Sequence, residues 1–332
     1  YNSEQIIELM EQGSTRGVKV MAFPELCLTA YTCSDLFLQE SLLREAKKEL
    51  KRILQASKSK DMILFVGMPW MHKGKLYNVA AVLNRGRILG IVPKKHLPNY
   101  SEFYELRHFN PGMEKVEMTD WEGVQVPMGM NLLFACRTMP ELVLAAELCE
   151  DVWVPCPPSI SHALAGATVI ANCSASDETT GKDQYRYNLI CGQSARLVCG
   201  YIYANAGEGE SSQDLVFGGQ NIIAENGTCL VQSDRFKNAC ICADLDLGRI
   251  ISERRRMTTF RDEENRSASY ETVYFELNTE DSAKKDSKKA GQKRDELLRY
   301  IDPAPFVPHD AGQRERRCEE ILSIQAMGLK KR

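Results

Sequence analysis

The first 258 residues alternate between two hydrophobic periods, one typical of helices and the other of strands. Residues 40–57 carry apolar side chains on one helical face, which predicts an amphipathic helix. A helix is also indicated at the N-terminus, where residues 2–5 resemble a capping box and apolar positions follow with helical spacing. Short apolar runs predict strands at 18–23, 61–68, 76–84 and 87–92.

The same alternation continues in the second half of the chain. The run LVLAAELC at 142–149 is apolar almost throughout, as in strands buried on both faces of a sheet. The dipeptide Asn226-Gly227 lies between two apolar runs and predicts a hairpin. Helices are predicted at 159–166 and 184–199, and strands at 167–173 and 201–206. Two sets of strands interleaved with helices indicate a layered α/β fold.

The composition changes after residue 258. Residues 259–303 contain DEEN, KKDSKK and QKRDE and few large apolar side chains outside the predicted strand YETVYFEL, which indicates a solvated connector. An isolated apolar helix face needs a partner surface, so we expect a second domain to begin at 304–332, after a first domain at 1–258. The apolar positions of this last helix are Ile321, Leu322, Ile324, Met327 and Leu329.

Composition and charge narrow the class of protein. The net charge of -3 gives no electrostatic reason to expect nucleic acid or an anionic membrane as partner. Most of the twelve cysteines lie in apolar runs such as LFAC and NACIC, where a thiol behaves as a small buried hydrophobe. No CxxC pair or histidine ligand spacing indicates a metal site. Without a secretory signal or a membrane-length apolar run, we expect a reduced, cytoplasmic protein.

The first candidate for chemistry is Glu25, in AFPEL. A predicted strand delivers this carboxylate directly after Pro24, whose ring restricts the backbone at the strand end. A glutamate at the end of a strand is more often a surface or capping group than a base, because glutamate is usually exposed.

The second candidate is Cys149, at the end of the LVLAAELC strand. A turn after a strand can present backbone N–H groups to a developing oxyanion, which suits a nucleophile. The alternative is a buried structural cysteine. The acidic neighbours Glu150 and Asp151 would raise the pKa of the thiol, so a reactive thiolate needs a cation beside it.

The third candidate, Lys94, follows Pro93 at a junction between strand and loop. In the same pocket as Cys149 it would supply that cation, whereas its alternative is an ordinary solvated lysine like Lys95.

Three motifs in this order resemble the glutamate, lysine and cysteine signatures of the carbon–nitrogen hydrolase (nitrilase) superfamily: FPELCLTAY, VPKKHLPNYSEFYE and ELCEDVW. Further segments, CEDVWVP, AGEGESSQDLVFGGQN and PFVP…GLKKR, are similar to the glutaminase domain of bacterial glutamine-dependent NAD synthetases. The resemblance covers essentially the whole chain. It implies a four-layer α-β-β-α sandwich, followed by the truncated start of a second α/β domain.

The resemblance also implies roles for the motif residues. Cys149 would attack the side-chain amide of glutamine and form a glutamyl thioester, which water then hydrolyses. Glu25 would be the general base and later the acid toward ammonia, and Lys94 would stabilise thiolate and oxyanion. Glu105, in SEFYE, resembles the glutamate that orients the lysine.

The same resemblance implies a glutamine pocket. Glu150 would pair with the α-ammonium group and Lys182 with the carboxylate, although Lys182 is equally compatible with a solvated loop lysine. Trp153 would form a wall of the pocket. The full set of implied glutamine contacts is Tyr100, Glu150, Trp153, Ser176 and Lys182. Four other cysteines are interpreted as core residues: Cys156, Cys173, Cys191 and Cys199.

Two parts of the family pattern are not found in this sequence. The first strand is expected before Tyr1, and the SGGxDS pyrophosphate loop of the synthetase domain is expected after the last helix; FGGQ at 217–220 lacks the Asp-Ser that follows in that loop. By resemblance, ATP and magnesium would serve that synthetase domain, ammonia would reach it through an internal tunnel, and the complete protein would be a homo-oligomer. We expect no cofactor or metal in residues 1–332 themselves.

Two other functions remain open. A free-standing amidase, nitrilase or carbamoylase of the superfamily would share Glu25, Lys94 and Cys149, although it would end near residue 258. A non-catalytic scaffold would keep the fold and serve only as an oligomer interface.

Overall fold

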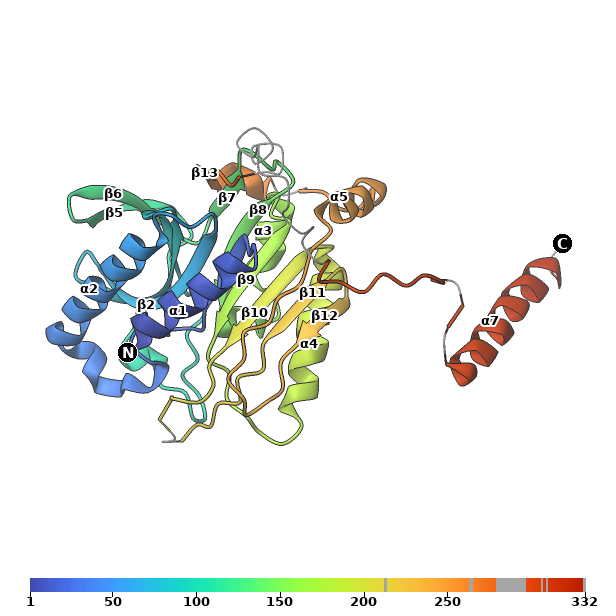
Figure 1. Cartoon of the computed structure of the whole chain (residues 1–332), viewed down its shortest axis with the longest axis horizontal. Helices are drawn as coiled ribbons and strands as arrows, with labels where there is room; N and C mark the ends of the chain where they lie inside the picture. Colours follow the sequence, from blue (N-terminus) through green and yellow to red (C-terminus); the bar gives the residue numbers. More distant parts are fainter. Residues whose placement is uncertain (212–213, 263–264, 279–296, 306, 309, 331–332) are drawn as a thin grey trace. The chain divides into compact units, whose positions relative to one another are not determined.

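The computed structural model describes residues 1–211, 214–262, 265–278, 297–305, 307–308 and 310–330. The chain divides into two units, Tyr1–Leu297 and Leu298–Arg332, and each is described by itself. Figure 1 shows the ribbon of the whole chain with its helices and strands labelled.

One sheet of the first unit has six strands in the order β1-β2-β3-β4-β6-β5. Its short first strand pairs in parallel with β2, which then forms a long antiparallel meander with β3 and β4. The strands are β1 (Val20–Ala22), β2 (Ile63–His72), β3 (Lys75–Asn84), β4 (Arg87–Pro93), β5 (Glu117–Trp121) and β6 (Val124–Met128).

The other sheet has seven strands in the order β12-β11-β10-β9-β8-β7-β13. At its centre, β8, β9 and β10 run parallel, so their carboxyl ends meet at one edge. The strands are β7 (Leu132–Cys136), β8 (Val143–Leu148), β9 (Val169–Ser174), β10 (Gly200–Asn205), β11 (Ile222–Glu225), β12 (Thr228–Gln232) and β13 (Glu271–Phe275).

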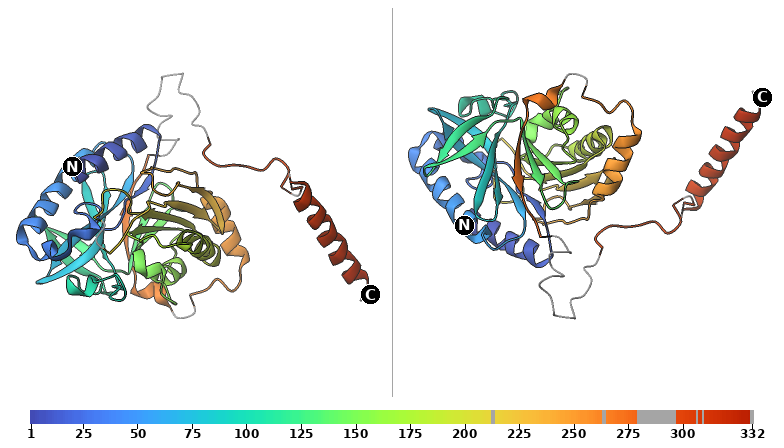
Figure 2. Two further views of the ribbon diagram at one scale, coloured as in Figure 1. Left: turned by 90° about the horizontal axis from the view of Figure 1, so that it is seen from below. Right: turned by 90° about the horizontal axis from the view of Figure 1, so that it is seen from above.

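The two sheets pack face to face, and helices cover their outer faces (Figure 2). Phe65 of one sheet meets Phe134 of the other edge to face, with ring centroids 6.2 Å apart, within the range of about 4.5–7 Å that such pairs prefer. The helices are α1 (Asn2–Thr15), α2 (Glu40–Ser57), α3 (Pro158–Leu164), α4 (Lys182–Leu197) and α5 (Leu247–Arg256). The 3₁₀ segments are η1 (Tyr31–Leu38), η2 (Glu105–Arg107), η3 (Cys149–Val152) and η4 (Arg266–Ser269).

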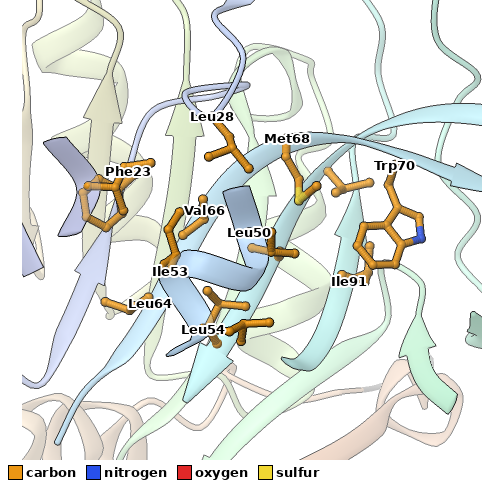
Figure 3. Close-up of a cluster of buried hydrophobic side chains, with 14 of the residues drawn as sticks. Phe23, Leu28, Leu50, Ile53, Leu54, Leu64, Val66, Met68, Trp70 and Ile91 are labelled. Carbon is orange, nitrogen blue, oxygen red and sulfur yellow. The ribbon is translucent and has the colours of Figure 1, made fainter. Parts of the chain in front are cut away.

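The helix α2 shows how the sequence pattern produces this layering. Its buried Leu50, Ile53 and Leu54 belong to one cluster with Leu64 and Val66 of β2 (Figure 3). Burying such a side chain stabilises the fold by about 1.5–3 kcal/mol relative to leaving it exposed. The four-layer α-β-β-α sandwich implied by the sequence is therefore confirmed.

Several local predictions agree with the structure. The capping box expected at residues 2–5 does not form, because the N-cap of α1 is Tyr1 and has no side-chain cap hydrogen bond. The helix α2 spans the predicted residues 40–57. The hairpins at Arg85-Gly86 and Asn226-Gly227 turn through left-handed backbone, with φ values of 46° and 79° at the first and 45° and 86° at the second. Such pairs of positive φ angles are what two-residue hairpin loops require.

The predicted connector at 259–303 needs a correction. Residues Glu271–Phe275 form β13, which pairs in parallel with β7 at the edge of the seven-stranded sheet, so this part is folded into the first unit. Phe275 and Leu277 are buried in the core between the sheets. The KKDSKK and QKRDE segments within 279–296 lie outside the described residues. Where a second domain begins stays a prediction.

The second unit contains the helix α7 (Ala311–Lys330), which agrees with the helix expected near the end of the chain. Its apolar side chains are all exposed within this unit: Ile321, Leu322, Ile324, Met327 and Leu329. Across the described residues, no helix combines the length and apolar character needed to cross a bilayer.

A close backbone approach fixes the position of the AFPEL segment against β2. A Cβ atom added to Gly67 would lie 2.4 Å from the Leu26 nitrogen and 2.4 Å from the Pro24 oxygen. Only a residue without a side chain lets β2 pass this close to the backbone around Glu25.

We predict that Gly67→Ala destabilises the protein by about 1–3 kcal/mol, because the backbone on both sides has to shift. Gly192→Ala is the matched control: an added Cβ there meets nothing within 4 Å, and the site lies inside α4. Alanine should therefore stabilise that helix by about 0.5–1 kcal/mol. Urea unfolding of both variants measures the difference, and equal effects would contradict the packing argument.

Candidate active site

The centre of the site is a buried ammonium group between two carboxylates. Lys94 Nζ lies 2.6 Å from Glu25 Oε1 and 2.6 Å from Glu105 Oε1. The side chains of Lys94 and Glu25 are 0% exposed and that of Glu105 is 5% exposed. The surface-glutamate and solvated-lysine interpretations are therefore wrong for Glu25 and Lys94, because neither side chain reaches solvent.

Glu25 is held by groups from three parts of the chain. Its Oε1 also accepts a hydrogen bond of 2.6 Å from the Asn78 amide on β3, and its Oε2 accepts one of 3.0 Å from the Ala175 N–H after β9. The Glu25 N–H donates to the Ser174 carbonyl oxygen at 3.2 Å. The last two bonds join the two sheets at the carboxyl ends of β1 and β9, so the sandwich itself positions this carboxylate.

The charges in this cluster shift one another's protonation. Burial alone would lower the pKa of Lys94, but Glu105 and Glu25 outweigh burial and hold that pKa well above its ordinary value. Burial raises the pKa of Glu105 to about 7, against the opposing attraction of Lys94. The Tyr31 hydroxyl donates to Glu105 Oε1 at 2.8 Å. Lys94 is therefore a permanent cation at the centre of the site.

Cys149 directly follows β8 and begins the turn η3. Its backbone has a φ of 40°, a left-handed conformation that is uncommon for any residue other than glycine. Burial raises the pKa of the Cys149 thiol well above its ordinary value, Glu25 and Glu105 raise it further, and Lys94 opposes the shift. The resting thiol is thus neutral, and both the Glu25 side chain and the Lys94 cation act on it.

Buried polar groups support the turn from behind. The Cys149 N–H donates to Asn172 Oδ1 at 3.2 Å, and Asn172 Nδ2 donates to the Tyr201 hydroxyl at 3.1 Å. The Tyr201 hydroxyl in turn donates to Glu147 Oε1, whose Oε2 accepts from the Ser159 N–H at 2.8 Å. This relay fixes the end of β8 and β9 next to the nucleophile.

Asp151 secures the other side of the same turn. It is buried, and its carboxylate accepts hydrogen bonds from the Leu148 N–H at 3.1 Å and from the His96 N–H at 2.9 Å. The first bond closes the turn around Cys149, and the second ties it to the loop that follows Lys94.

Two of the implied glutamine contacts meet at the mouth of the site. The Tyr100 hydroxyl donates to Glu150 Oε1 at 2.8 Å, and Tyr100 is 56% exposed. Burial raises the pKa of Glu150, although the Tyr100 hydrogen bond and the charge of Lys94 oppose the shift. A partly exposed carboxylate beside the nucleophile can accept a cationic group of a ligand.

Lys182 is neither a solvated lysine nor an unpaired one. Its side chain is 19% exposed, and its Nζ forms an ion pair with Asp177. The same ammonium group lies 5.4 Å from the ring centre of Trp153 and 5.9 Å from that of Phe103. The Trp153 ring stacks on Tyr185 with centroids 5.5 Å apart, which fixes the wall formed by Trp153.

Ser176 lies deeper, at the carboxyl end of β9. Its N–H donates to Asn205 Oδ1 at 2.7 Å, and its hydroxyl accepts from Arg186 at 3.2 Å. Arg186 is fully buried and also pairs with Glu178 at 2.8 Å. Ser176 is therefore held in place by an arginine that the sequence patterns did not single out.

Several supporting residues were not identified from the sequence. Asn78, Asn172 and Arg186 lie outside the quoted motifs and touch candidate residues only through the fold. Tyr31 is the last residue of FPELCLTAY, but no role was assigned to it there. Asn78 is a polar residue followed by apolar residues on the buried strand β3, which was only a weak indication of a role in the site. The predicted site residues themselves are brought to one region, and their roles in catalysis stay predictions.

The cysteine predictions have a mixed outcome. Cys173, Cys191 and Cys199 are buried, as expected for core residues. Cys156 is exposed, and in NACIC Cys240 is exposed and Cys242 is half-buried, so the core interpretation is wrong for these three. Their apolar neighbours lie in loops, where a short apolar run does not imply burial.

The fold and this cluster define a class: an α-β-β-α hydrolase sandwich with a cysteine beside a buried glutamate–lysine pair. A model of the carbon-nitrogen hydrolase family matches residues 1–255. The chain therefore belongs to the carbon-nitrogen hydrolase family.

Among curated relatives, the chain is 39% identical over 337 residues to the glutamine-dependent NAD(+) synthetase of Mycobacterium tuberculosis, covering 100% of this chain and 48% of that protein. It is 32% identical over 248 residues to the glutamine-dependent NAD(+) synthetase of Thermotoga maritima, covering 74% of this chain and 39% of the relative. The chain thus spans about half the length or less of these relatives.

Solved structures give the same picture. A glutamine-dependent NAD(+) synthetase from Cytophaga hutchinsonii superposes with a TM-score of 0.64 at 29% identity, covering 70% of this chain and 38% of that one. An amidase of the nitrilase superfamily from Nesterenkonia superposes with a TM-score of 0.54 at 20% identity, over 70% of this chain and 80% of the amidase. The second likeness shows the shared fold alone. Relatives of this kind support an enzymatic role.

The buried relay yields a prediction about pH and stability. Burial raises the pKa of Glu147 from 4.5 to about 7. The folded state therefore binds a proton at Glu147 more tightly than the unfolded state does. The stability that this proton contributes is fully present below pH 4.5 and is lost as the pH rises through 7. Glu147→Gln keeps an acceptor oxygen but cannot ionise. From about pH 5 to about pH 8, wild-type unfolding free energy should fall relative to that of Glu147→Gln by on the order of 1–3 kcal/mol.

Urea unfolding at several pH values measures this difference. The control is Glu8→Gln, since Glu8 is exposed on α1 and its replacement should give a difference with no comparable pH dependence. A Glu147→Gln difference that stays constant with pH would show that Glu147 does not titrate in this way.

Proposed function

We propose that this unit is a glutamine amidohydrolase with Cys149 as nucleophile, Glu25 as general base and Lys94 as electrostatic stabiliser. The observation that carries the proposal is the buried pair of Lys94 and Glu25 at 2.6 Å, acting on a neutral thiol at a strand end. A buried thiol with a raised pKa does not react unaided, so it needs a base beside it, and the Glu25 side chain lies in the same buried cluster.

In the first half of the reaction, Glu25 removes the proton of the Cys149 thiol as the sulfur attacks the side-chain carbonyl carbon of glutamine. The carbonyl oxygen becomes an oxyanion, which Lys94 and a backbone N–H after Cys149 stabilise. Glu25 then passes the proton to the departing nitrogen. Ammonia leaves, and a glutamyl thioester remains on Cys149.

In the second half, Glu25 removes a proton from water, which attacks the thioester carbonyl carbon. The carbon–sulfur bond breaks, the proton returns to the sulfur, and glutamate leaves. Glu105 is assigned a positioning role, because it holds Lys94 from the side opposite Glu25 at 2.6 Å. The Tyr31 hydroxyl bond in turn limits where Glu105 can move.

Glutamine is favoured as substrate because the mouth of the site offers groups of opposite charge. Glu150 is assigned to the α-ammonium group of glutamine, next to the Tyr100 hydroxyl. Lys182 is assigned to the α-carboxylate of glutamine. The substrate carboxylate and Asp177 would then both bind the Lys182 ammonium group. Trp153 and the Ser176 region close the sides of the pocket around the aliphatic part of the substrate.

The relatives suggest where the ammonia goes. They are named glutamine-dependent NAD(+) synthetases and are about twice as long as this chain. In the proposed scheme, a synthetase domain uses ATP, magnesium and this ammonia to convert nicotinic acid adenine dinucleotide to NAD, with an internal tunnel between the sites. A homo-oligomer is part of the same proposal, as is catalysis by the present unit without a cofactor or metal.

Two alternatives remain distinct from this proposal. A free-standing amidase or nitrilase would use the same three residues on a substrate without the two α-substituents, and the fold shared with the Nesterenkonia amidase is compatible with it. A non-catalytic oligomerisation scaffold would hydrolyse no amide. The buried charges at the site argue against a scaffold, because burying an ion costs several kcal/mol and contributes nothing to an interface.

One prediction tests the role of Cys149 as nucleophile. Cys149→Ala should lower glutamine hydrolysis by about 10⁴-fold or more, because no thioester can form. The matched control is Cys156→Ser, which removes an exposed thiol and should leave turnover unchanged. Release of glutamate and ammonia is measured with glutamine, asparagine and simple amides. Turnover of simple amides without glutamine would favour the amidase, and no turnover of any amide would favour the scaffold.

A second prediction concerns substrate recognition. Lys182→Ala should raise the KM for glutamine by about ten-fold with a much smaller change in kcat, because a charge-assisted contact to the carboxylate is lost. Lys95→Ala is the control, since the Lys95 side chain is paired with Glu114 at 2.6 Å on the surface. Equal KM values for the two variants would refute the assignment of Lys182.

A further inference from the structure

A pair of thiols lies outside the catalytic cluster, in the loop between β12 and α5. Cys240 and Cys242 are two residues apart in a segment without helix or strand, so one short stretch of backbone carries both thiols. Cys240 is exposed and Cys242 is half-buried. Neither thiol takes part in the proposed hydrolysis, so their pairing at an accessible position calls for a separate explanation.

The surroundings make the two thiols unequal. The neighbouring Cys240 thiol lowers the pKa of the Cys242 thiol to about 6; burial and Asp244 oppose this shift, and Arg16 at the end of α1 supports it. The same interaction raises the pKa of Cys240. Near neutral pH the loop therefore holds one thiolate beside one thiol. This is the arrangement of an attacking and a resolving cysteine.

A metal site explains the pair less well. Across the described residues, no group of three or more histidine, cysteine, aspartate or glutamate side chains is placed to hold a metal ion. Two thiols alone give half of the four ligands that structural zinc sites use.

The residues just before the pair connect it to the candidate active site. The Ala239 carbonyl oxygen accepts a hydrogen bond of 3.0 Å from Asn221, whose Oδ1 accepts one of 2.9 Å from the Asn205 N–H. The Asn205 side chain binds both the N–H and the carbonyl oxygen of Ser176. Three amide groups thus link the thiol loop to the end of β9.

A second connection starts at Asn238. Its Oδ1 accepts from the Glu208 N–H at 3.2 Å, and two residues later the Glu210 carboxylate accepts from the Tyr31 N–H at 2.8 Å. The Tyr31 hydroxyl reaches Glu105, the carboxylate beside Lys94. Hydrogen bonds and short stretches of chain therefore connect residues 238–239 to Ser176 and to Glu105, two residues of the candidate site.

We propose that Cys240 and Cys242 form a dithiol that hydroperoxides oxidise to a disulfide, and that this oxidation slows glutamine turnover through Asn238 and Ala239. The second half of the proposal rests on the proposed glutaminase function. The first half is a property of the loop and stands independently of that function.

The chemistry requires one hydroperoxide for each pair. The Cys242 thiolate attacks one peroxide oxygen and breaks the O–O bond, which gives a sulfenic acid on Cys242 and releases water or an alcohol after proton uptake. The Cys240 sulfur then attacks the Cys242 sulfur and displaces the sulfenic oxygen as a second water. Sulfur loses two electrons and the peroxide gains them.

The new bond would change the backbone. A disulfide between residues two apart closes a small ring and demands a fixed S–S torsion and a restricted separation of the Cα atoms. Those constraints fall on residues 240–242, next to the two residues that bind Asn221 and Glu208. A backbone change at residues 240–242 would therefore act on the contacts of Asn238 with Glu208 and of Ala239 with Asn221.

The first experiment maps the oxidation. Hydrogen peroxide is added to the reduced protein, and trypsin then releases residues 238–249 as one peptide that contains only these two cysteines. Its mass should fall by two hydrogen atoms and recover with dithiothreitol. In Cys240→Ser, dimedone should trap a sulfenic acid on Cys242; in Cys242→Ser, it should trap far less on Cys240. A peptide that stays reduced while exposed Cys156 is oxidised would overturn the dithiol.

The second experiment separates this pair from the nucleophile. After the same peroxide treatment, kcat/KM for glutamine should be lower in the wild type than in the Cys240→Ser/Cys242→Ser variant by about threefold or more, the range that coupling networks carry. Dithiothreitol should remove the difference, and any loss shared by both proteins reports on Cys149. Equal values in the two proteins would overturn the coupling. If the reduced wild type does not hydrolyse glutamine, the proposed function fails with the coupling, and the peptide map still decides the dithiol.

Discussion

The site depends on one constraint, the burial of a single ammonium group that both sheets must surround. Removing a charge from water costs several kcal/mol, and close pairing with opposite charges has to offset this cost. Lys94 is paired with two carboxylates, and the supporting bonds come from β3, from the segment after β9 and from η1. Loss of one partner would leave an uncompensated charge and cost about 3–5 kcal/mol. Glu25, which pairs with Lys94, also binds the segment after β9, so one carboxylate serves the site and joins the two sheets.

This arrangement keeps the Cys149 thiol unreactive until a substrate carbonyl group is in place. The thiol of Cys149 stays neutral at rest because burial and two anions oppose its ionisation. A neutral thiol is a poor target for stray electrophiles, and it becomes a nucleophile only when a carbonyl group is placed to accept the charge near Lys94. The loop thiol Cys242 is the opposite case, ionised and close to the surface. One chain thus holds two cysteines whose reactivity is set in opposite directions by burial and neighbouring charge.

The parts of this structure that could be predicted from sequence are those with a local cause. The helix α2 has a regular apolar face, and both two-residue hairpins contain a residue pair suited to positive φ. Glu25, Lys94 and Cys149 each follow a strand, so the meeting of strand ends brings them together. Asn78 and Asn172 could not be predicted as partners, because their roles depend on pairing between distant segments. YETVYFEL was predicted as a strand, but its charge-rich surroundings placed it in a connector, whereas β13 pairs with β7 at the edge of the sheet.

The left-handed backbone of Cys149 has a further consequence for how such domains change over time. Holding a residue with a side chain at a φ of 40° costs roughly 1–2 kcal/mol, which a glycine at the same place would not incur. Selection for catalysis therefore maintains a local strain that selection for folding alone would remove. In a lineage where the domain survives only as a scaffold, this position is where glycine should appear first, and the loss of strain would make the decayed domain more stable than its active ancestor.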